Sequence, residues 1–204
     1  MKENQIITIG RQFGSGGRQV GQQLAEKLGI PCYDKEVLAR AAEHSGLSEK
    51  IIKNYDEKPR SIFFSSASDS YTFGVVGAGA DDTIENRAMK ATMQALWHIE
   101  EEGSCIIIGR AADYFLKHQE NLIRVFIYAP MEFRIAEVSR RDGIPEDKAR
   151  RRILQADKKR AAYYNFYTMK QWGDLQSYDI CINSAMRGVE GTADILWRLV
   201  EGDC

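Results

Sequence analysis

The chain has 204 residues, of which 44% are hydrophobic and 28% charged, and its formal net charge is −1 at pH 7. This length suits one α/β domain with a substantial core, with or without a small inserted subdomain, and the composition is that of a globular protein. The near-zero charge excludes a global basic field, and no apolar run approaches a membrane span, so we expect neither a nucleic-acid nor a membrane partner.

The N-terminus lacks the apolar core of a signal peptide, and the four cysteines show no C-x-x-C spacing. Both features favour buried, reduced thiols and a cytoplasmic location.

The first element is an apolar strand at 5–10 that runs into a glycine-rich turn and then into an amphipathic helix at 17–28. This arrangement places backbone N–H groups and the positive end of a helix around a phosphate. A plain tight turn is the alternative. The residues predicted to hold cofactor phosphates are Arg11, Gly14, Ser15, Gly16, Gly17, Arg18 and Gln19.

The rest of the chain alternates between strands and helices, which predicts a parallel sheet with right-handed crossovers. Further strands are expected at 30–34, 104–109, 122–128 and 178–183. Further helices are expected at 35–44, 48–57, 83–102, 131–141, 146–162 and 189–201.

Two stretches lack a clear period. The segment 59–82, rich in Ser, Gly and aromatic residues, is expected to be a long loop, and 163–177 an irregular aromatic region. Aromatic residues of the first segment are expected to cover a bound base, to make a contact in a homodimer, or to pack over neighbouring helices.

Several polar residues follow the predicted strands directly. Ligands of open α/β sheets bind outside the carboxyl ends of the strands, which is where Asp34, Arg110, Asp113 and Asn183 are expected. Each has a structural alternative: Asp34 caps the next helix, Arg110 pairs with Asp113, and Asn183 turns the chain. Their convergence on one edge favours a functional site.

A basic cluster occupies the helix at 146–162. The three arginines at 150–152 cannot all face one side of a helix, and a solvated surface is the usual interpretation of such a run. The cluster continues at 158–160, however, and phosphoryl transfer needs cations around the transferring group. We therefore expect a polyphosphate ligand near this helix.

The chain resembles the cytidylate kinase-like family, a branch of the P-loop nucleoside monophosphate kinases, over nearly its full length. The resemblance rests on 7–18, 33–38 and 108–113, and on Asp157, Arg160 and Tyr164. It implies a three-layer α/β/α fold of the P-loop NTPase class with a five-stranded parallel sheet. It also implies a core of 1–34, 103–141 and 178–204, a helical monophosphate-binding insert at 35–102 and a lid-like segment at 142–177.

The same resemblance implies an ATP-dependent phosphotransferase that uses Mg²⁺ and acts on a nucleoside monophosphate or another small phosphate acceptor. No protein ligand to the metal is assigned. The residues expected to bind the acceptor are Asp34, Arg40, Arg110, Asp113 and Asp157. The residues expected to act in phosphoryl transfer are Arg18, Arg152, Lys159 and Arg160.

Three positions depart from the family pattern: Gly17 replaces the P-loop Lys, Gln19 the Thr, and Ala111 the Asp of a Gly-Arg-Asp motif. Losing a cation from the outer phosphates would cost several kcal/mol, on the order of a thousandfold in rate, unless Arg18 or a lid arginine replaces it. A nucleotide-binding regulatory protein without kinase turnover is therefore the second hypothesis.

A third hypothesis is an NAD(P)-dependent reductase, because Gly10, Gly14 and Gly16 also match the glycine spacing of short-chain dehydrogenases. Those enzymes use a Tyr-x-x-x-Lys pair, and none of the nine tyrosines here has Lys four residues later.

Overall fold

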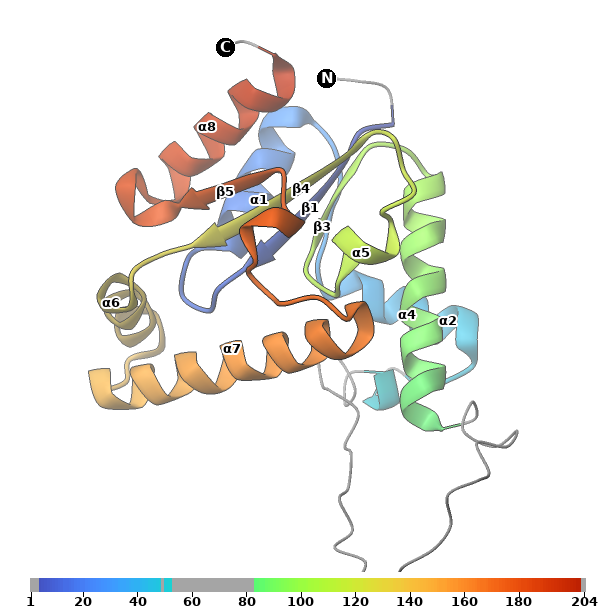
Figure 1. Cartoon of the computed structure of the whole chain (residues 1–204), viewed down its shortest axis with the longest axis horizontal. Coiled ribbons are helices and arrows are strands. Elements are labelled where there is room, and N and C mark those ends of the chain that lie inside the picture. The colour runs from blue at the N-terminus through green and yellow to red at the C-terminus, as the bar shows by residue number, and fades with distance from the viewer. Residues whose placement is uncertain (1–3, 49, 53–82, 203–204) are drawn as a thin grey trace, which may run out of the picture.

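The computed structural model describes residues 4–48, 50–52 and 83–202 (Figure 1). The loop predicted at 59–82 lies outside the described residues, and of the helix predicted at 48–57 only 50–52 are described as helical.

Five parallel strands form one sheet in the order β2-β3-β1-β4-β5. They are β1 (Ile6–Arg11), β2 (Cys32–Tyr33), β3 (Cys105–Ile108), β4 (Leu122–Tyr128) and β5 (Ile180–Asn183). Strand β1 is central, and its Ile7 lies opposite Ile106 of β3 and Ile123 of β4. The five-stranded parallel sheet is thus confirmed, and the β1 loop opens at the middle of its carboxyl edge.

Helices cover both faces of the sheet. One face carries α1 (Gly17–Leu28) and α8 (Gly188–Glu201), and the other carries α2 (Glu36–Ser45) and α4 (Ile84–Glu101) (Figure 1). Successive residues of β3 alternate between the two, since Ile106 packs with α1 and α8 and Ile107 with α2 and α4. The predicted three-layer α/β/α fold is confirmed.

Three further helices are α5 (Ala112–Phe115), α6 (Met131–Asp142) and α7 (Glu146–Thr168). In Figure 1, α7 runs across the carboxyl ends of the strands. The prediction of irregular structure from residue 163 was wrong for its first part, because α7 continues to Thr168. Tyr163 and Tyr164 are buried against Ala111, and this packing favours continuation of the helix.

Short 3-10 turns, η2 (Leu175–Ser177) and η3 (Ser184–Met186), flank β5. Over the described residues, no helix combines the length and apolar character needed to cross a membrane. The division into core, insert and lid-like segment stays a prediction.

Candidate functional site

A cavity of about 800 Å³ lies where β1, β2 and β3 end, and α6 and α7 contribute to its wall. Small-molecule sites typically measure about 300–1,000 Å³. Seven of its lining residues are basic and two are acidic: Arg11, Arg18, Lys35, Arg110, Arg141, Arg152 and Arg160, against Asp34 and Asp142. This excess of positive charge favours an anionic ligand.

The glycine-rich loop forms the floor of the cavity. Gly14 and Gly16 have φ angles of 83° and 76°, and Gly16 is the N-cap of α1 without a side-chain capping bond. A Cβ on Gly14 would lie only 3.1 Å from the backbone oxygen of Arg134 in α6. Because the first N–H groups of a helix have no partner within the helix, the start of α1 offers them to an anion in the cavity.

The Ser15 side chain holds this loop in place. Its Oγ lies 2.9 Å from the carbonyl oxygen of Gln12 and 3.1 Å from that of Ile127, and the residue is 1% exposed. The Ser184 hydroxyl donates to the Ser15 carbonyl oxygen at 2.6 Å. The Ser15 hydroxyl thus bonds the loop to β4, and its predicted contribution to a cofactor site is limited to the backbone.

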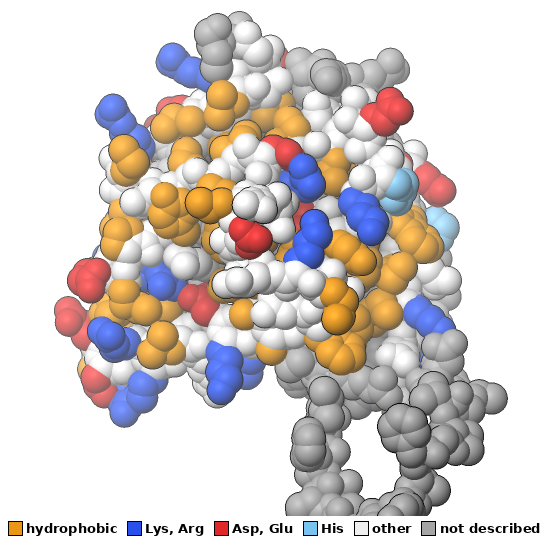
Figure 2. Space-filling model, in the orientation of Figure 1, with side chains coloured by type: hydrophobic (Ala, Val, Ile, Leu, Met, Phe, Trp, Pro, Cys, Tyr) orange, Lys and Arg blue, Asp and Glu red, His pale blue; other side chains and the backbone are white. Residues whose placement is uncertain are grey.

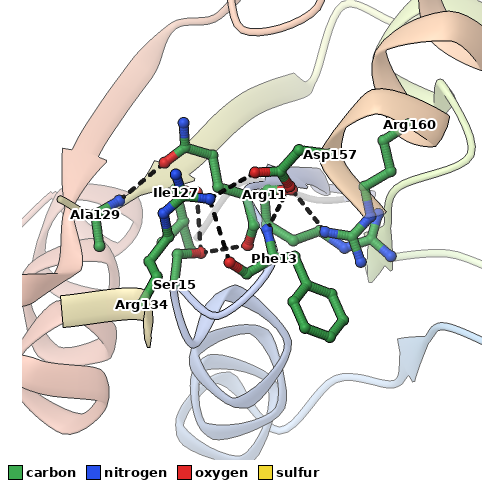
Figure 3. A network of polar contacts seen from close by, with 9 residues as sticks. Arg11, Phe13, Ser15, Ile127, Ala129, Arg134, Asp157 and Arg160 are labelled. Carbon is green, nitrogen blue, oxygen red and sulfur yellow. Dashed lines mark hydrogen bonds and ion pairs between the residues drawn. The ribbon is translucent and has the colours of Figure 1, made fainter. Parts of the chain in front are cut away.

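Asp157 ties α7 to the loop (Figure 3). Its Oδ1 accepts the Phe13 N–H at 2.7 Å, and its Oδ2 accepts from Arg134 Nη1 at 2.5 Å. The side chains of Asp157 and Arg134 are 16% and 7% exposed. Both oxygens of Asp157 are engaged by protein donors behind the loop, and its role in binding the acceptor stays a prediction.

The Phe13 ring gathers three arginines. The guanidinium carbons of Arg141, Arg152 and Arg160 lie 5.2, 5.8 and 5.7 Å from the ring centroid, within the range of cation–π attraction. Sequence reasoning missed Phe13, because an aromatic residue in a glycine-rich turn carries no phosphate-binding signal of its own.

Asp142, at the end of α6, joins two of these arginines. Its Oδ1 accepts from Arg141 Nε at 2.8 Å and its Oδ2 from Arg152 Nη1 at 2.7 Å. The Arg141 guanidinium holds the pKa of Asp142 below its ordinary value. Sequence reasoning also missed Asp142, although it follows the basic end of a predicted helix directly.

The arginines at 150–152 face different ways, as predicted. Arg152 lines the cavity, whereas Arg151 pairs with Asp147 at 2.5 Å on the exposed face of α7. Lys159 is exposed and, among the described residues, lies outside the cavity lining. Figure 2 shows basic and acidic side chains interspersed over α6 and the start of α7.

Asp34 forms the opposite wall of the cavity, after β2. Its Oδ2 lies 2.9 Å from Arg18 Nε and its Oδ1 3.1 Å from Arg110 Nη1. Arg110 Nη1 also donates to the carbonyl oxygen of Ile108 at 3.0 Å. Asp34 does not cap the next helix, because the N-cap of α2 is Lys35, which has no side-chain capping bond. Asp34 thus fixes two arginines at one edge, as its predicted place on the rim implies.

The backbone around Arg110 has an uncommon conformation. Gly109, Arg110 and Ala111 have φ angles of 75°, 57° and 51°, and non-glycine residues seldom adopt such values. Strain of this kind often marks functional sites. Here the turn holds the Arg110 side chain, 3% exposed, against the cavity wall.

Two other predicted positions have structural partners outside the cavity. Arg40 pairs with Glu102 and lies over the Tyr33 ring. Asp113 is buried in α5, where its Oδ2 accepts the Tyr164 hydroxyl at 2.7 Å. Burial raises the pKa of Asp113 to about 6. Of the described residues, Arg40 and Asp113 lie outside the lining of the 800 Å³ cavity, and their role in acceptor binding stays a prediction.

The remaining rim position, Asn183, also has a structural role. Its Oδ1 accepts the Ala185 N–H at 3.0 Å and caps η3. This is the chain-turning alternative that the sequence left open.

Comparison with known proteins places these features in a family. Residues 6–186 match the model of the cytidylate kinase-like family. A cytidylate kinase of Pyrococcus horikoshii is 24% identical over 202 residues, covering 98% of this chain and 90% of the relative. A cytidylate kinase of Methanopyrus kandleri is 26% identical over 206 residues, covering 96% and 93%.

Solved structures agree on the fold. An uncharacterized protein from Eubacterium ventriosum has a TM-score of 0.70 and 28% identity, covering 97% of this chain and 98% of the other. A shikimate kinase from Bacteroides thetaiotaomicron has a TM-score of 0.56 at 16% identity, with 98% and 99% coverage, and this likeness concerns the fold alone. Since the family model spans most of its length, the chain belongs to the cytidylate kinase-like family.

Proposed function

We propose that this protein is an ATP-dependent phosphotransferase whose acceptor is a nucleoside monophosphate, cytidylate-like, or another small phosphate. One observation carries the proposal: the glycine-rich loop at the start of α1 and a second, buried arginine site face the same basic cavity. Relatives named cytidylate kinases over nearly the whole chain support it. The reductase hypothesis is set aside because the family is kinase-like.

The donor phosphates would bind at the glycine-rich loop. The N–H groups at the start of α1 meet phosphate oxygens there, and the backbone at Gly16 allows their close approach. Arg152 and Arg160 lie on the other side of the loop and would steady the transferring phosphoryl group. Cationic side chains that are already in position stabilise the charge of the transition state, and they lower the barrier because they do not have to move during the reaction.

The residues present offer no complete magnesium site. In the described part of the chain, no group of three or more His, Cys, Asp or Glu could hold a metal. The cavity acids Asp34 and Asp142 each already hold two arginines, and the Ser15 hydroxyl faces backbone carbonyls. Magnesium that travels with ATP takes most of its ligands from phosphates and water, so the protein contribution to the metal stays small.

The acceptor phosphate would bind between Arg18 and Arg110, where Asp34 now holds both guanidinium groups. An arginine pair presents several N–H donors to a phosphate. Arg110 is fixed by Ile108 and by its turn, so its position does not depend on the ligand. Arg18, whose side chain is 48% exposed, has room to rotate toward the acceptor.

The reaction then needs no general base. An oxygen of the acceptor phosphate attacks the γ-phosphorus and forms a new P–O bond, while the bond from the γ-phosphorus to the β–γ bridging oxygen breaks. The products are ADP and the acceptor diphosphate. The acceptor is already an anion, so positioning and charge stabilisation supply most of the rate enhancement.

A coupled assay of ADP release over a panel of nucleoside monophosphates tests this function. We expect turnover with at least one of them, and Arg110→Met should raise the acceptor KM about a hundredfold, as loss of a charge-assisted phosphate contact would. Arg151→Met, on the exposed face of α7, is the matched control and should match the wild type.

Absence of turnover with every monophosphate, at high enzyme concentration, would contradict the kinase function. The second candidate, a nucleotide-binding regulator without turnover, is favoured by Gly17, which leaves the loop without lysine. Calorimetric binding of ATP without phosphoryl transfer would select it.

A further inference from the structure

Position 17 of the loop is closed to any side chain. A Cβ placed on Gly17 would lie 2.6 Å from Cβ and 3.2 Å from Cγ of Arg11. Cβ atoms do not approach other carbons that closely, so the stem of Arg11 excludes a lysine at position 17. The Cβ and Cγ of Arg11 therefore occupy the space that the first side-chain carbons of such a lysine would need.

The backbone of Arg11 is held in the sheet. It is the last residue of β1, and its Cα lies opposite that of Ile127 in the central part of the sheet. Its carbonyl oxygen accepts from Arg160 Nη1 at 3.0 Å, and Figure 3 shows Arg160 reaching from α7 to Arg11. Both residues line the cavity together with Gly16 and Gly17.

Arg160 is fixed almost as firmly, because it lies one helical turn after Asp157. The bonds of Asp157 to Phe13 and Arg134 hold this part of α7 on the loop. Arg18, in contrast, lies against Asp34 on the acceptor side of the cavity. Arg11, Arg152 and Arg160 thus line the part of the cavity next to the glycine-rich loop, which is the donor side of the proposed function.

We propose that Arg11 replaces the missing P-loop lysine: its guanidinium is the resident cation for the outer phosphates of a bound nucleoside triphosphate, with Arg160 beside it. This inference rests on the proposed function. It explains why lysine is absent at position 17: the aliphatic parts of Arg11 and of a lysine at position 17 would compete for the same space, and the cation comes from position 11 instead.

Calorimetry with AMP-PNP, a non-hydrolysable ATP analogue, and with AMP tests the inference. Arg11→Met keeps a stem over Gly17 but removes the charge, so AMP-PNP should bind at least tenfold more weakly, while AMP binding should change less than twofold. Arg11→Lys keeps a charge and should stay within threefold of the wild type. Arg151→Met is the control for loss of an arginine outside the cavity.

A positional exchange gives a second readout. Gly17→Lys alone should lower the melting temperature, because its Cβ meets Arg11. The double variant with Arg11→Gly and Gly17→Lys removes that contact, and we expect it to bind AMP-PNP within threefold of the wild type. A folded double variant that does not regain affinity would contradict the spatial equivalence of the two side chains.

The outcomes separate the two proposals. If the wild type binds AMP-PNP and Arg11→Met binds it equally well, Arg11 is not the replacement cation, and the proposed function stands. If the wild type binds no nucleotide, both proposals fall. Should Arg11→Met not fold, as judged by circular dichroism, Arg11→Gln serves as the second neutral variant, with the same expected loss.

Discussion

Two aspartates of similar exposure, 13% and 16%, each hold a pair of arginines at opposite ends of the cavity, and the pairs differ in whether one arginine is buried. Asp34 joins Arg18, whose side chain is 48% exposed, to Arg110, whose side chain is 3% exposed. Asp142 joins Arg141 to Arg152, whose side chains are 44% and 55% exposed. The Asp34 cluster thus contains one buried arginine, whereas both arginines of the Asp142 cluster are exposed.

The difference in burial separates their functions. A buried charge pair is expensive to break, so the pair of Asp34 and Arg110 keeps one geometry and suits recognition of a specific acceptor, while the exposed Arg18 can move. An exposed pair is worth little and exchanges partners readily, so the Asp142 cluster suits arginines that move onto phosphates and leave again. Four variants test this comparison.

The largest effect is expected at Asp34. Asp34→Asn leaves the buried Arg110 charge without its carboxylate, and the free energy of unfolding should fall by about 3 kcal/mol or more. Urea denaturation followed by circular dichroism measures it. Asp147→Asn, in an exposed pair with Arg151, is the matched control. A loss below about 1 kcal/mol would mean that the Asp34 cluster behaves as a surface pair.

Asp113 sharpens the comparison, because it is buried but accepts a tyrosine hydroxyl. Burial raises its pKa to about 6 in the folded protein, above the ordinary value of 3.8. The folded state therefore holds this proton more tightly, and its contribution to stability is lost as pH rises from about 4 to about 6.

Asp113→Asn should remove the loss of stability that the wild type undergoes as pH rises through the pKa of Asp113. The stability of the variant relative to the wild type should rise by on the order of 3 kcal/mol between pH 4 and pH 7.5. Urea denaturation of both proteins across that range measures the difference. A pH-independent difference would show that the Asp113 carboxyl titrates normally.

A smaller effect is expected at the exposed cluster. Arg152→Met should lower kcat about tenfold, or about 1.4 kcal/mol, with the acceptor KM within twofold, because Arg152 lies on the donor side. Steady-state kinetics of ADP release separate the two constants. A rise of the acceptor KM with kcat unchanged would assign Arg152 to the acceptor and would contradict the division of the cavity.

The smallest effect is expected for Asp142→Asn, which should change the free energy of unfolding by less than about 1 kcal/mol. Thermal unfolding in low and high salt measures it, and salt should reduce the difference further. A loss as large as that of Asp34→Asn would remove the contrast between the two clusters.

Much of the fold could be predicted from the sequence. The apolar runs of β1, β3 and β4 and the glycine at the end of α1 mark their elements directly. The four-residue α5 could not be predicted, because it is shorter than the window over which a helical period is visible. The end of α7 was missed because burial of its aromatic residues against Ala111 is a tertiary effect.

The site could be predicted in outline only. Ligands of open α/β sheets bind outside the carboxyl ends of the strands, and this rule predicted that the loop, Asp34 and Arg110 lie at one edge, as they do in the structure. The sequence could not show that Asp157 binds behind the loop, that Arg40 pairs with Glu102, or that Arg11 fills the space at Gly17. Each of these depends on contact between residues that are distant in the chain or on side-chain volume, and neither kind of feature leaves a local pattern in the sequence.

The central claim is that the cavity transfers a phosphoryl group from ATP to a second phosphate. Phosphorus NMR of the wild-type protein with ATP and CMP tests it most directly, because the products have distinct resonances. We expect ADP and CDP to appear in equal amounts. ADP accompanied only by inorganic phosphate, or an unchanged spectrum with CMP and with every other monophosphate tried, would contradict the claim.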